Sequence, residues 1–351
     1  MNKNKKILKI AHLHVWDKKN KGDVAIVLAV QELLKNKFKN CQIIDFPVQL
    51  LKEGKTSDAK KINQTDLVVI GGGGIFYSYF LPYNKEFIKM ITSPIAIFGA
   101  GYIKEVDAPE LKSESAKSIA YLADCAKFVG VRDNNTKKFL IKNGAKGKNI
   151  EVIGDPAALL SEKKPTLNKI ESLKLNKKNV SLRIGLNLNY SGWLGFGKWH
   201  DDILRAYREV AEYFQAEYGA QIYYLKHHEG ENKIYPELKI KNLKVVDLKP
   251  SEQKYVYGQL DFVVGMMLHV GVMAFGAGTP EISVAYDLRN HSFAEFVGHP
   301  ELVVDLKDLK KGELLKRVQL IFSKNKKYKK DFLNIRNIIA KKQDKFLNNL
   351  I

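Results

Sequence analysis

The sequence predicts an α/β protein of two domains, each built on a parallel β-sheet. Short apolar runs alternate with amphipathic stretches along the whole chain, a pattern typical of parallel strands covered by helices. The 351 residues are enough for about two domains, each with a core of its own. Each half repeats the strand–helix order of the other, so both domains are expected to be Rossmann-like.

The apolar runs place six strands in each half of the chain. Strands are predicted near 7–13, 42–47, 67–71, 95–99, 127–131 and 151–153, and then near 183–188, 221–226, 243–248, 262–266, 281–286 and 302–305. The clearest helices are expected at 23–38 and 113–126. The resulting division is a first domain at 1–160, a linker at 161–178, a second domain at 179–325 and a C-terminal helix at 326–351.

The C-terminal helix is predicted to be amphipathic. Phe332, Ile335, Ile339 and Phe346 recur at helical spacing, with lysines on the other faces. We expect the apolar side to pack back on the body of the protein. The alternative is a basic helix that lies on an anionic membrane surface.

The chain carries a formal net charge of +20, most of it from lysine, because only seven residues are arginine. Such a field favours anionic partners, for example phosphorylated substrates or an acidic membrane surface. Nucleic acid is not expected as a partner, since the basic residues are spread along the chain and are not interleaved with aromatic residues.

Several features indicate a cytoplasmic protein, compatible with peripheral contact at the inner face of the membrane. No apolar run approaches the ~18 residues of a membrane span. Residues 7–15, which follow a basic start at 1–6, are expected to form a core strand and not a signal peptide. Cys41 and Cys125 are far apart in the sequence and are expected to be buried thiols of a reducing compartment.

Glycine-rich segments follow two strands of the first half. Four consecutive glycines, Gly71–Gly74, come after the apolar run 67–70, and Gly99–Gly101 interrupt a second run. Bare backbone N–H groups suit an anion or a polyhydroxyl ligand, and Tyr77 to Tyr79 could line the same pocket. The spacing matches neither a P-loop nor a dinucleotide motif, so we expect two neighbouring glycine turns at a ligand-binding edge.

Charged side chains also lie at strand ends in this half. Asp23 follows the first strand and is expected to cap the next helix, or to lie in a loop over a substrate. Arg132 ends another strand and could bind a carboxylate or phosphate, although an ion pair with Asp133 or Asp155 is nearly as good an explanation. Asp155 is expected to orient a loop.

The most informative stretch of the second half runs from 260 to 290. One strand ends at His269 and the next ends before Arg289, so the two side chains should meet at the ligand-binding edge of a parallel sheet. Lys226 to Glu229 follow an earlier strand. Two histidines and a glutamate suggest a metal, but adjacent side chains of an extended segment point to opposite faces. A polar loop, or contact of Lys226 and a histidine with an anionic ligand, is therefore favoured over a metal site.

These segments, in their order along the chain, resemble the polysaccharide pyruvyl transferase family. The segments that carry the resemblance are Asn20-x-Gly22-Asp23-x-Ala25-Ile26, Gly71–Gly74, Gly99-Ala100-Gly101, Val131-Arg132-Asp133, Asp155-Pro156-Ala157, Gly185-Leu186-Asn187, Leu268-His269 and Tyr286-Asp287-x-Arg289. The resemblance implies a GT-B-like architecture, with two parallel sheets facing across a cleft. It also implies transfer of the pyruvyl group of phosphoenolpyruvate to two sugar hydroxyls, with formation of a ketal and release of phosphate.

On this resemblance, His269 is the expected catalytic residue, for proton transfer or for holding the phosphate. The expected donor-binding residues are Arg289, Lys226, Arg132, Gly276, Gly278 and Thr279, and the expected acceptor-binding residues are Asp23, Gly72, Gly73, Gly74 and Gly101. No metal and no cofactor are expected, because phosphoenolpyruvate acts as a co-substrate. The acceptor would be a sugar, a glycan or a lipid-linked glycan.

The chain departs from the family at Met267. Members of the family usually carry arginine two residues before the histidine, and methionine cannot replace its fork of hydrogen-bond donors. Two other functions therefore stay open: a GT-B glycosyltransferase with a nucleotide-sugar donor, and a non-catalytic protein that binds a glycan or a membrane surface.

Overall fold

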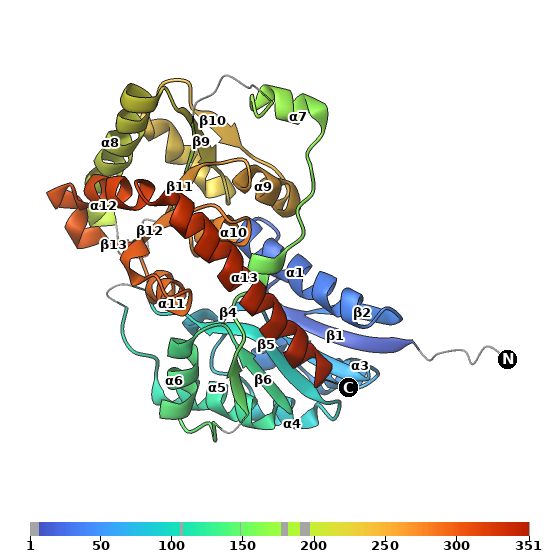
Figure 1. Ribbon diagram of the computed structural model, residues 1–351. Helices are drawn as coiled ribbons and strands as arrows, with labels where there is room; N and C mark the ends of the chain where they lie inside the picture. Colours follow the sequence, from blue (N-terminus) through green and yellow to red (C-terminus); the bar gives the residue numbers. More distant parts are fainter. Residues whose placement is uncertain (1–6, 106–107, 148, 177–181, 190–196, 351) are drawn as a thin grey trace.

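A computed structural model of the protein describes residues 7–105, 108–147, 149–176, 182–189 and 197–350. It consists of two lobes, each built around a parallel sheet (Figure 1). The fold class expected from the sequence is therefore confirmed. The basic residues 1–6, expected to precede the first strand, lie outside the described residues.

The sheet of the first lobe has the strand order β2-β1-β3-β5-β6-β7, and β4 pairs with β5. Its strands are β1 (Leu8–His14), β2 (Cys41–Pro47), β3 (Leu67–Ile70), β4 (Gly73–Phe76), β5 (Ile95–Tyr102), β6 (Phe128–Val131) and β7 (Ile150–Val152). Its helices are α1 (Lys21–Lys37), α2 (Leu50–Glu53), α3 (Thr56–Ile62), α4 (Lys85–Met90), α5 (Ser113–Cys125) and α6 (Asn134–Lys142).

The sheet of the second lobe has the order β10-β9-β8-β11-β12-β13. Its strands are β8 (Arg183–Leu186), β9 (Gln221–Leu225), β10 (Lys244–Val246), β11 (Phe262–Gly265), β12 (Glu281–Ala285) and β13 (Val303–Asp305). Its helices are α8 (His200–Tyr218), α9 (Pro250–Tyr257), α10 (Leu268–Gly276), α11 (Leu288–Phe296) and α12 (Glu313–Phe322). All twelve strands predicted from the apolar runs are present in the two sheets.

The glycine segments of the first lobe differ from the prediction. Gly73–Phe76 form strand β4, and Gly99–Gly101 lie inside β5, so the two segments are paired strands and not turns. The glycines adopt positive φ angles, 87° at Gly73 and 67° at Gly99, where the chain bends and the strand register shifts. Ile75 and Phe76, both fully buried, explain why the chain stays in the sheet beyond the glycines.

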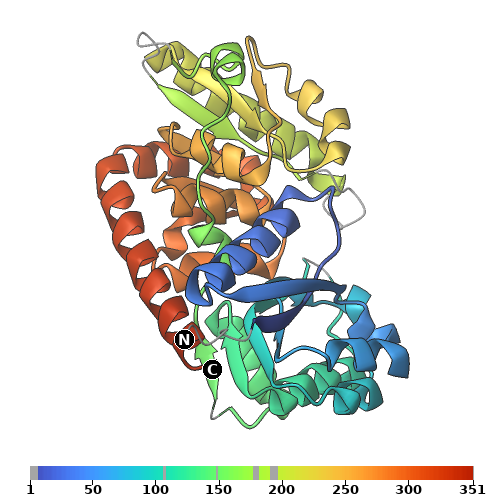
Figure 2. The same cartoon turned by 90° about the vertical axis from the view of Figure 1, so that its right-hand side faces the viewer.

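The two lobes share a core through helix α1, which lies between them (Figure 2). Its buried residues Ile26 and Ala29 belong to the same apolar cluster as Val272 and Phe275 of α10. Helix α1 therefore holds the first lobe against the second, and the loop before it lies where the two sheets meet.

The C-terminal helix α13 (Asn325–Asn348) contacts both lobes (Figure 1). Phe332 packs against Phe275 of the second lobe, with 5.1 Å between ring centroids. Phe346 packs against Phe98 of the first lobe at 5.7 Å. The segment that connects the lobes in sequence forms the short helix α7 (Leu167–Ser172), which lies beside the second lobe (Figure 1).

Two further features concern the membrane and the cysteines. Within the described residues, no helix is both long and apolar enough to cross a membrane. Both cysteines are free, but the expectation of buried thiols is wrong: Cys125 is exposed at the end of α5 and Cys41 is half-buried.

Candidate functional site

A cavity of about 450 Å³ lies where the carboxyl edges of the two sheets meet. This is the place where open parallel sheets bind ligands, and loops that follow β1, β5, β8, β11 and β12 contribute to it. The residues of the first lobe that line it are Val15, Trp16, Asp17, Asn20, Asp23, Gln49, Gly74, Tyr77, Tyr79, Phe80, Ile103 and Glu105. Those of the second lobe are Asn189, Met267, Leu268, His269, Tyr286 and Arg289.

Arg289 is held rigidly at the start of helix α11. Asp287 accepts from the backbone N–H of Arg289 at 2.7 Å and from its Nε at 2.8 Å, while Nη2 donates to the Tyr286 hydroxyl at 2.8 Å. Although burial alone lowers the pKa of Arg289, the Asp287 carboxylate raises it above the usual range. The described residues offer no acceptor to Nη1, so this corner of the guanidinium can bind an anion from the cavity.

His269 occupies the first turn of helix α10, directly against helix α1 of the other lobe. A Cβ at Gly22 would lie 2.3 Å from His269 Nδ1, so only glycine permits this approach. Burial, followed by the positive charges of Arg132 and Arg289, lowers the pKa of His269 well below its ordinary value. The imidazole is therefore held in its neutral form, in which one ring nitrogen carries a lone pair.

Behind His269 lies a buried group of ionisable side chains. Asp155 Oδ2 is 3.8 Å from His269 Nε2 and 3.7 Å from Arg132 Nη1. Arg132 also donates from Nε to Asp133 at 3.3 Å and packs under Gly101, where a Cβ would lie 2.4 Å from its guanidinium carbon. The structure thus pairs Arg132 with both aspartates, and its side chain lies behind the cavity wall. Asp155 Oδ1 accepts from Ala157 N at 2.9 Å and so orients the loop.

Asp23 faces the cavity from the first turn of α1. It is not the cap expected from the sequence, because the helix begins at Lys21 and the side chain of Asn20 accepts from Gly22 N at 3.0 Å. Burial and the neighbouring Asp17 carboxylate raise the pKa of Asp23 to about 7. A carboxyl group that is half-protonated near neutrality can give or take a proton.

Replacing Asp23 by asparagine tests this assignment through its dependence on pH. The pKa of Asp23 in the folded protein, about 7, is above that of an unfolded chain, about 3.9. Its contribution to stability is therefore complete below the unfolded pKa and is lost as the pH rises through 7. We expect the melting temperature of Asp23→Asn to exceed that of the wild type at pH 8.5 and to approach it at pH 5.5, measured by calorimetry. An equal difference at both values would contradict the raised pKa.

The predicted acceptor-side glycines do not all reach the cavity. Gly74 lines it, close to Arg289 Nη1. Gly72 and Gly73 pack against Ile26 of helix α1, and Gly101 covers Arg132. These three glycines permit close packing between elements and do not contact the cavity.

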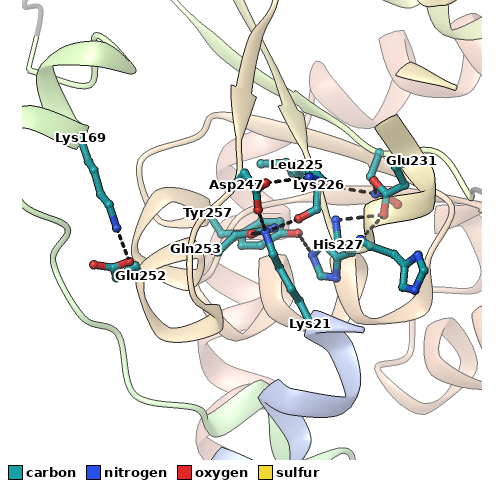
Figure 3. Close-up of polar contacts among 12 residues, drawn as sticks. Lys21, Lys169, Leu225, Lys226, His227, Glu231, Asp247, Glu252, Gln253 and Tyr257 are labelled. Atoms are coloured by element: carbon teal, nitrogen blue, oxygen red, sulfur yellow. Dashed lines mark hydrogen bonds and ion pairs between the residues drawn. The ribbon is translucent and has the colours of Figure 1, made fainter. Parts of the chain in front are cut away.

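Four of the predicted donor-side residues lie elsewhere. Lys226 Nζ donates to Asp247 at 2.7 Å and lies outside the cavity lining (Figure 3). Gly276 is the last residue of α10, at the end opposite His269, and packs against the backbone of Ala158. Gly278 packs against Leu333, and Thr279 donates its hydroxyl to Tyr257 O at 2.7 Å. Helix α10 ends at Gly276, and the last turn of a helix leaves carbonyl groups and not N–H groups unpaired, so this segment does not offer helix N–H groups to a donor.

The two adjacent histidines after β9 point in different directions, as the extended segment predicts. His227 is buried and its Nε2 is 2.8 Å from the Tyr257 hydroxyl (Figure 3). His228 Nδ1 instead accepts from Gly230 N at 2.9 Å. Both therefore serve local structure.

Lys21 connects the lobes beside the cavity. From the first turn of α1 it reaches the second lobe, where Nζ donates to Asp247 at 2.6 Å, to Lys226 O at 2.8 Å and to Gln253 at 3.2 Å (Figure 3). Its side chain is only 16% exposed, and burial lowers its pKa. This contact fixes α1, and with it Gly22 and Asp23, against the second lobe.

Replacing Lys21 by methionine should lower the free energy of unfolding by about 1–2 kcal/mol. The reason is that two buried acceptors, the Lys226 carbonyl and the Gln253 side chain, lose their donor. Lys19 provides a matched control, since it also crosses between the lobes, to Glu229 at 3.5 Å, but with 69% of its side chain exposed. We expect Lys19→Met to stay within about 0.5 kcal/mol of the wild type in chemical denaturation. Equal effects of the two variants would show that Lys21 is only a surface charge.

Several cavity residues escaped the sequence analysis. Trp16 and Asp17 come from the loop after β1, Glu105 from the segment after β5, and Asn189 from the segment after β8. Tyr77 was expected there, and its hydroxyl donates to Glu105. The sequence signal for these residues was a polar or aromatic residue just after a strand. Many strands of this chain are followed by such a residue, so the signal does not single out the ones that line the cavity.

Solved structures with a similar fold include proteins that act on or bind nucleotide sugars. UDP-GlcNAc 2-epimerase from Methanocaldococcus jannaschii is 13% identical, with a TM-score of 0.57, and the match covers 90% of this chain and 93% of that one. The Neisseria meningitidis enzyme of the same name is 11% identical, with a TM-score of 0.60 and coverage of 95% and 99%. Anabaena Alr3699/HepE, in complex with UDP-glucose, is 13% identical, with a TM-score of 0.55 and coverage of 95% of each chain. These matches establish a GT-B-like fold.

Comparison with curated protein sequences gave no significant match. A sequence model of one family, however, matches residues 20–287, which begin just before helix α1 and end at the carboxylate that holds Arg289. The match includes cavity residues of both lobes, although Trp16, Asp17 and Arg289 lie outside it, and it covers more than half of the 351 residues. The protein therefore belongs to the polysaccharide pyruvyl transferase family and is a transferase.

Proposed function

We propose that the protein transfers the pyruvyl group of phosphoenolpyruvate to two hydroxyls of one sugar, forming a ketal and releasing phosphate. The observation that carries this proposal is the meeting of Arg289 and His269 from the second lobe with Asp23 from the first, in one cavity. Arg289 supplies a cation for an anionic donor, and His269 and Asp23 supply two groups that can move protons.

Arg289 binds the donor in this proposal. Phosphoenolpyruvate carries a phosphate and a carboxylate, and the free Nη1 of Arg289 can donate to either. Met267 lines the cavity where the family usually has arginine, so Arg289 from the next strand supplies the charge. The buried Arg132 adds a positive field from behind His269.

Asp23 and His269 move the protons. In the first step, the methylene carbon of phosphoenolpyruvate gains a proton from Asp23, a sugar hydroxyl forms a bond to the neighbouring carbon, and the hydroxyl proton passes to His269. In the second step, the bond from that carbon to the phosphate oxygen breaks and the second hydroxyl forms the ring. The leaving phosphate takes up the second hydroxyl proton. The two protons lost by the hydroxyls thus equal the one gained by the methylene carbon and the one gained by phosphate, and return of a proton from His269 to Asp23 restores both residues.

The acceptor lies against the first lobe. Trp16, Tyr77 and Tyr79 present aromatic rings to the cavity, and such rings pack well against the apolar face of a sugar. Glu105 and Asn189 add hydrogen-bonding groups at its rim. The net charge of +20 supports an acceptor carried on an anionic membrane surface, such as a lipid-linked glycan at the cytoplasmic face.

Phosphate release from phosphoenolpyruvate, with a glycan or glycolipid extract as acceptor, tests this function directly. We expect release that depends on both the protein and the extract, and a gain of the pyruvyl mass on the acceptor. If phosphoenolpyruvate raises the melting temperature but no extract leads to release of phosphate, the protein binds the donor without transferring its pyruvyl group.

A second function is supported by Met267 and by the fold of the nucleotide-sugar proteins. In this second function, the protein binds a nucleotide sugar in the same cavity and transfers the sugar to an acceptor through a glycosidic bond. Melting temperatures measured with phosphoenolpyruvate and with a panel of nucleotide sugars separate the two proposals. Stabilisation by a nucleotide sugar alone would favour the glycosyltransferase.

A further inference from the structure

Two histidines and an aspartate come together on one face of the first sheet, outside the cavity lining. His12 and His14 are two residues apart on β1 and therefore share a face. Asp45 on β2 is the direct partner of His12 in the strand register. His12 and His14 are buried, whereas Asp45 has 43% of its side chain exposed, so the cluster opens toward solvent on the aspartate side.

The hydrogen bonds of the two rings fix where their protons lie. His12 Nε2 contacts Gly71 O, a carbonyl, so this nitrogen carries the proton and Nδ1 carries a lone pair. Nδ1 is buried and has no partner among the described residues. His14 Nδ1 donates to Val15 O at 2.8 Å, so in the neutral ring Nε2 carries the lone pair.

That lone pair of His14 faces a second acceptor. Asp45 Oδ1 lies 3.2 Å from His14 Nε2, and two lone pairs at this distance repel unless a proton or a cation lies between them. A proton on His14 would satisfy this pair, but it would leave His12 Nδ1 buried without a partner. A metal ion can accept the lone pairs of all three residues.

The distances suit a small divalent ion. One ligand atom from each of the three residues lies within 4.8 Å of the others. In a tetrahedral zinc site with bonds of about 2.1 Å, neighbouring ligand atoms are about 3.4 Å apart, close to the 3.2 Å between His14 and Asp45.

The surroundings of the cluster resemble those of metal ligands. Each histidine bonds a backbone carbonyl through its other ring nitrogen, which fixes the tautomer. Gln31 of helix α1 donates to Asp45 Oδ1 at 2.7 Å and so orients the carboxylate. Ligating carboxylates are commonly held in this way.

We propose that His12, His14 and Asp45 bind a divalent transition-metal ion of the zinc type, with water as the fourth ligand. Two imidazoles and one carboxylate are the donor set that such ions prefer over Mg²⁺ or Ca²⁺. The site is separate from the proposed transfer reaction and does not depend on it.

A bound ion would also act on the cavity wall. The His14 ring stacks on Trp16, with centroids 5.1 Å apart and planes inclined by 7°, and Trp16 lines the cavity. Holding His14 on a metal therefore holds the Trp16 ring. Co²⁺, which absorbs visible light and quenches tryptophan fluorescence, is the suitable probe.

The test is a titration of the untagged full-length protein with Co²⁺ and, separately, with Zn²⁺. We expect one equivalent of Co²⁺ to produce the intense visible band of tetrahedral coordination and to quench Trp16, and Zn²⁺ to displace it and raise the melting temperature. Loss of an outer-shell partner typically weakens metal affinity by roughly 10- to 100-fold, so Asp45→Asn and His14→Gln, which remove a ligand, should each weaken the affinity for Co²⁺ by at least that factor.

His291 provides the matched control. Its Nε2 is 2.8 Å from Asp305, in an exposed pair that no third ligand joins in the described structure. His291→Gln should leave the affinity unchanged. Because Asp45 is exposed, Asp45→Asn is expected to fold, and circular dichroism checks this. Absence of Co²⁺ binding, or equal affinity in the wild type and Asp45→Asn, would overturn the proposal.

Discussion

Replacing His269 by glutamine is expected to lower the rate of phosphate release from phosphoenolpyruvate by about 10²- to 10⁴-fold, the range for loss of a group that moves a proton in the transition state. His269 lines the cavity and is kept neutral by burial and by two arginines. Glutamine keeps a polar side chain of similar length but cannot accept the hydroxyl proton. The change should therefore appear in kcat more than in the affinity for phosphoenolpyruvate.

Two comparisons make this expectation specific. His291→Gln removes an exposed histidine of the same lobe, in helix α11, and should keep wild-type turnover. The melting temperature of His269→Gln, measured in parallel, separates a loss of chemistry from a loss of folding. Full turnover and full donor affinity in His269→Gln would remove this residue from the mechanism.

Replacing Arg289 by methionine should have its main effect on the donor. Nη1 is the corner of the guanidinium free to bind an anion, and Nε and Nη2 are held by Asp287. Removing one partner of a buried charge pair leaves the other charge buried and unpaired, which costs about 2–5 kcal/mol. We therefore expect kcat/KM for phosphoenolpyruvate to fall by roughly 30- to 5000-fold, and the donor to lose its stabilising effect in thermal melts.

Lysine at this position should not restore the activity, because an ammonium group cannot bond Asp287, Tyr286 and the donor in the same plane. Arg317 supplies the control. It pairs with Glu313 at 3.1 Å on helix α12, away from the cavity, so Arg317→Met should leave kcat/KM unchanged. Wild-type donor affinity in Arg289→Met would show that another cation, such as Arg132, binds the donor.

The strand pattern needed no tertiary information. Runs such as Phe262-Val263-Val264 are typical of a parallel sheet covered on both faces, and they alternate with amphipathic helices in both halves. The same pattern places His269 and Arg289 at one sheet edge, because the carboxyl ends of neighbouring parallel strands lie side by side. Both residues line the cavity.

Contacts between distant segments decided the rest. Lys226 also follows a strand, but Asp247 at the end of the adjacent strand and Lys21 from the other lobe hold it in a network away from the cavity. Gly72 and Gly73 pack against helix α1 because β4 extends the sheet beneath it.

The sequence by itself determined the two parallel sheets, since hydrophobic periodicity is a local property of the chain. It also determined which side chains stand at the strand ends. Which of these side chains share a cavity, and which are instead paired with an opposite charge, depends on contacts between distant segments. The pKa of about 7 at Asp23 and the approach of His269 to Gly22 depend on how the lobes pack, and that packing brings together residues more than two hundred positions apart.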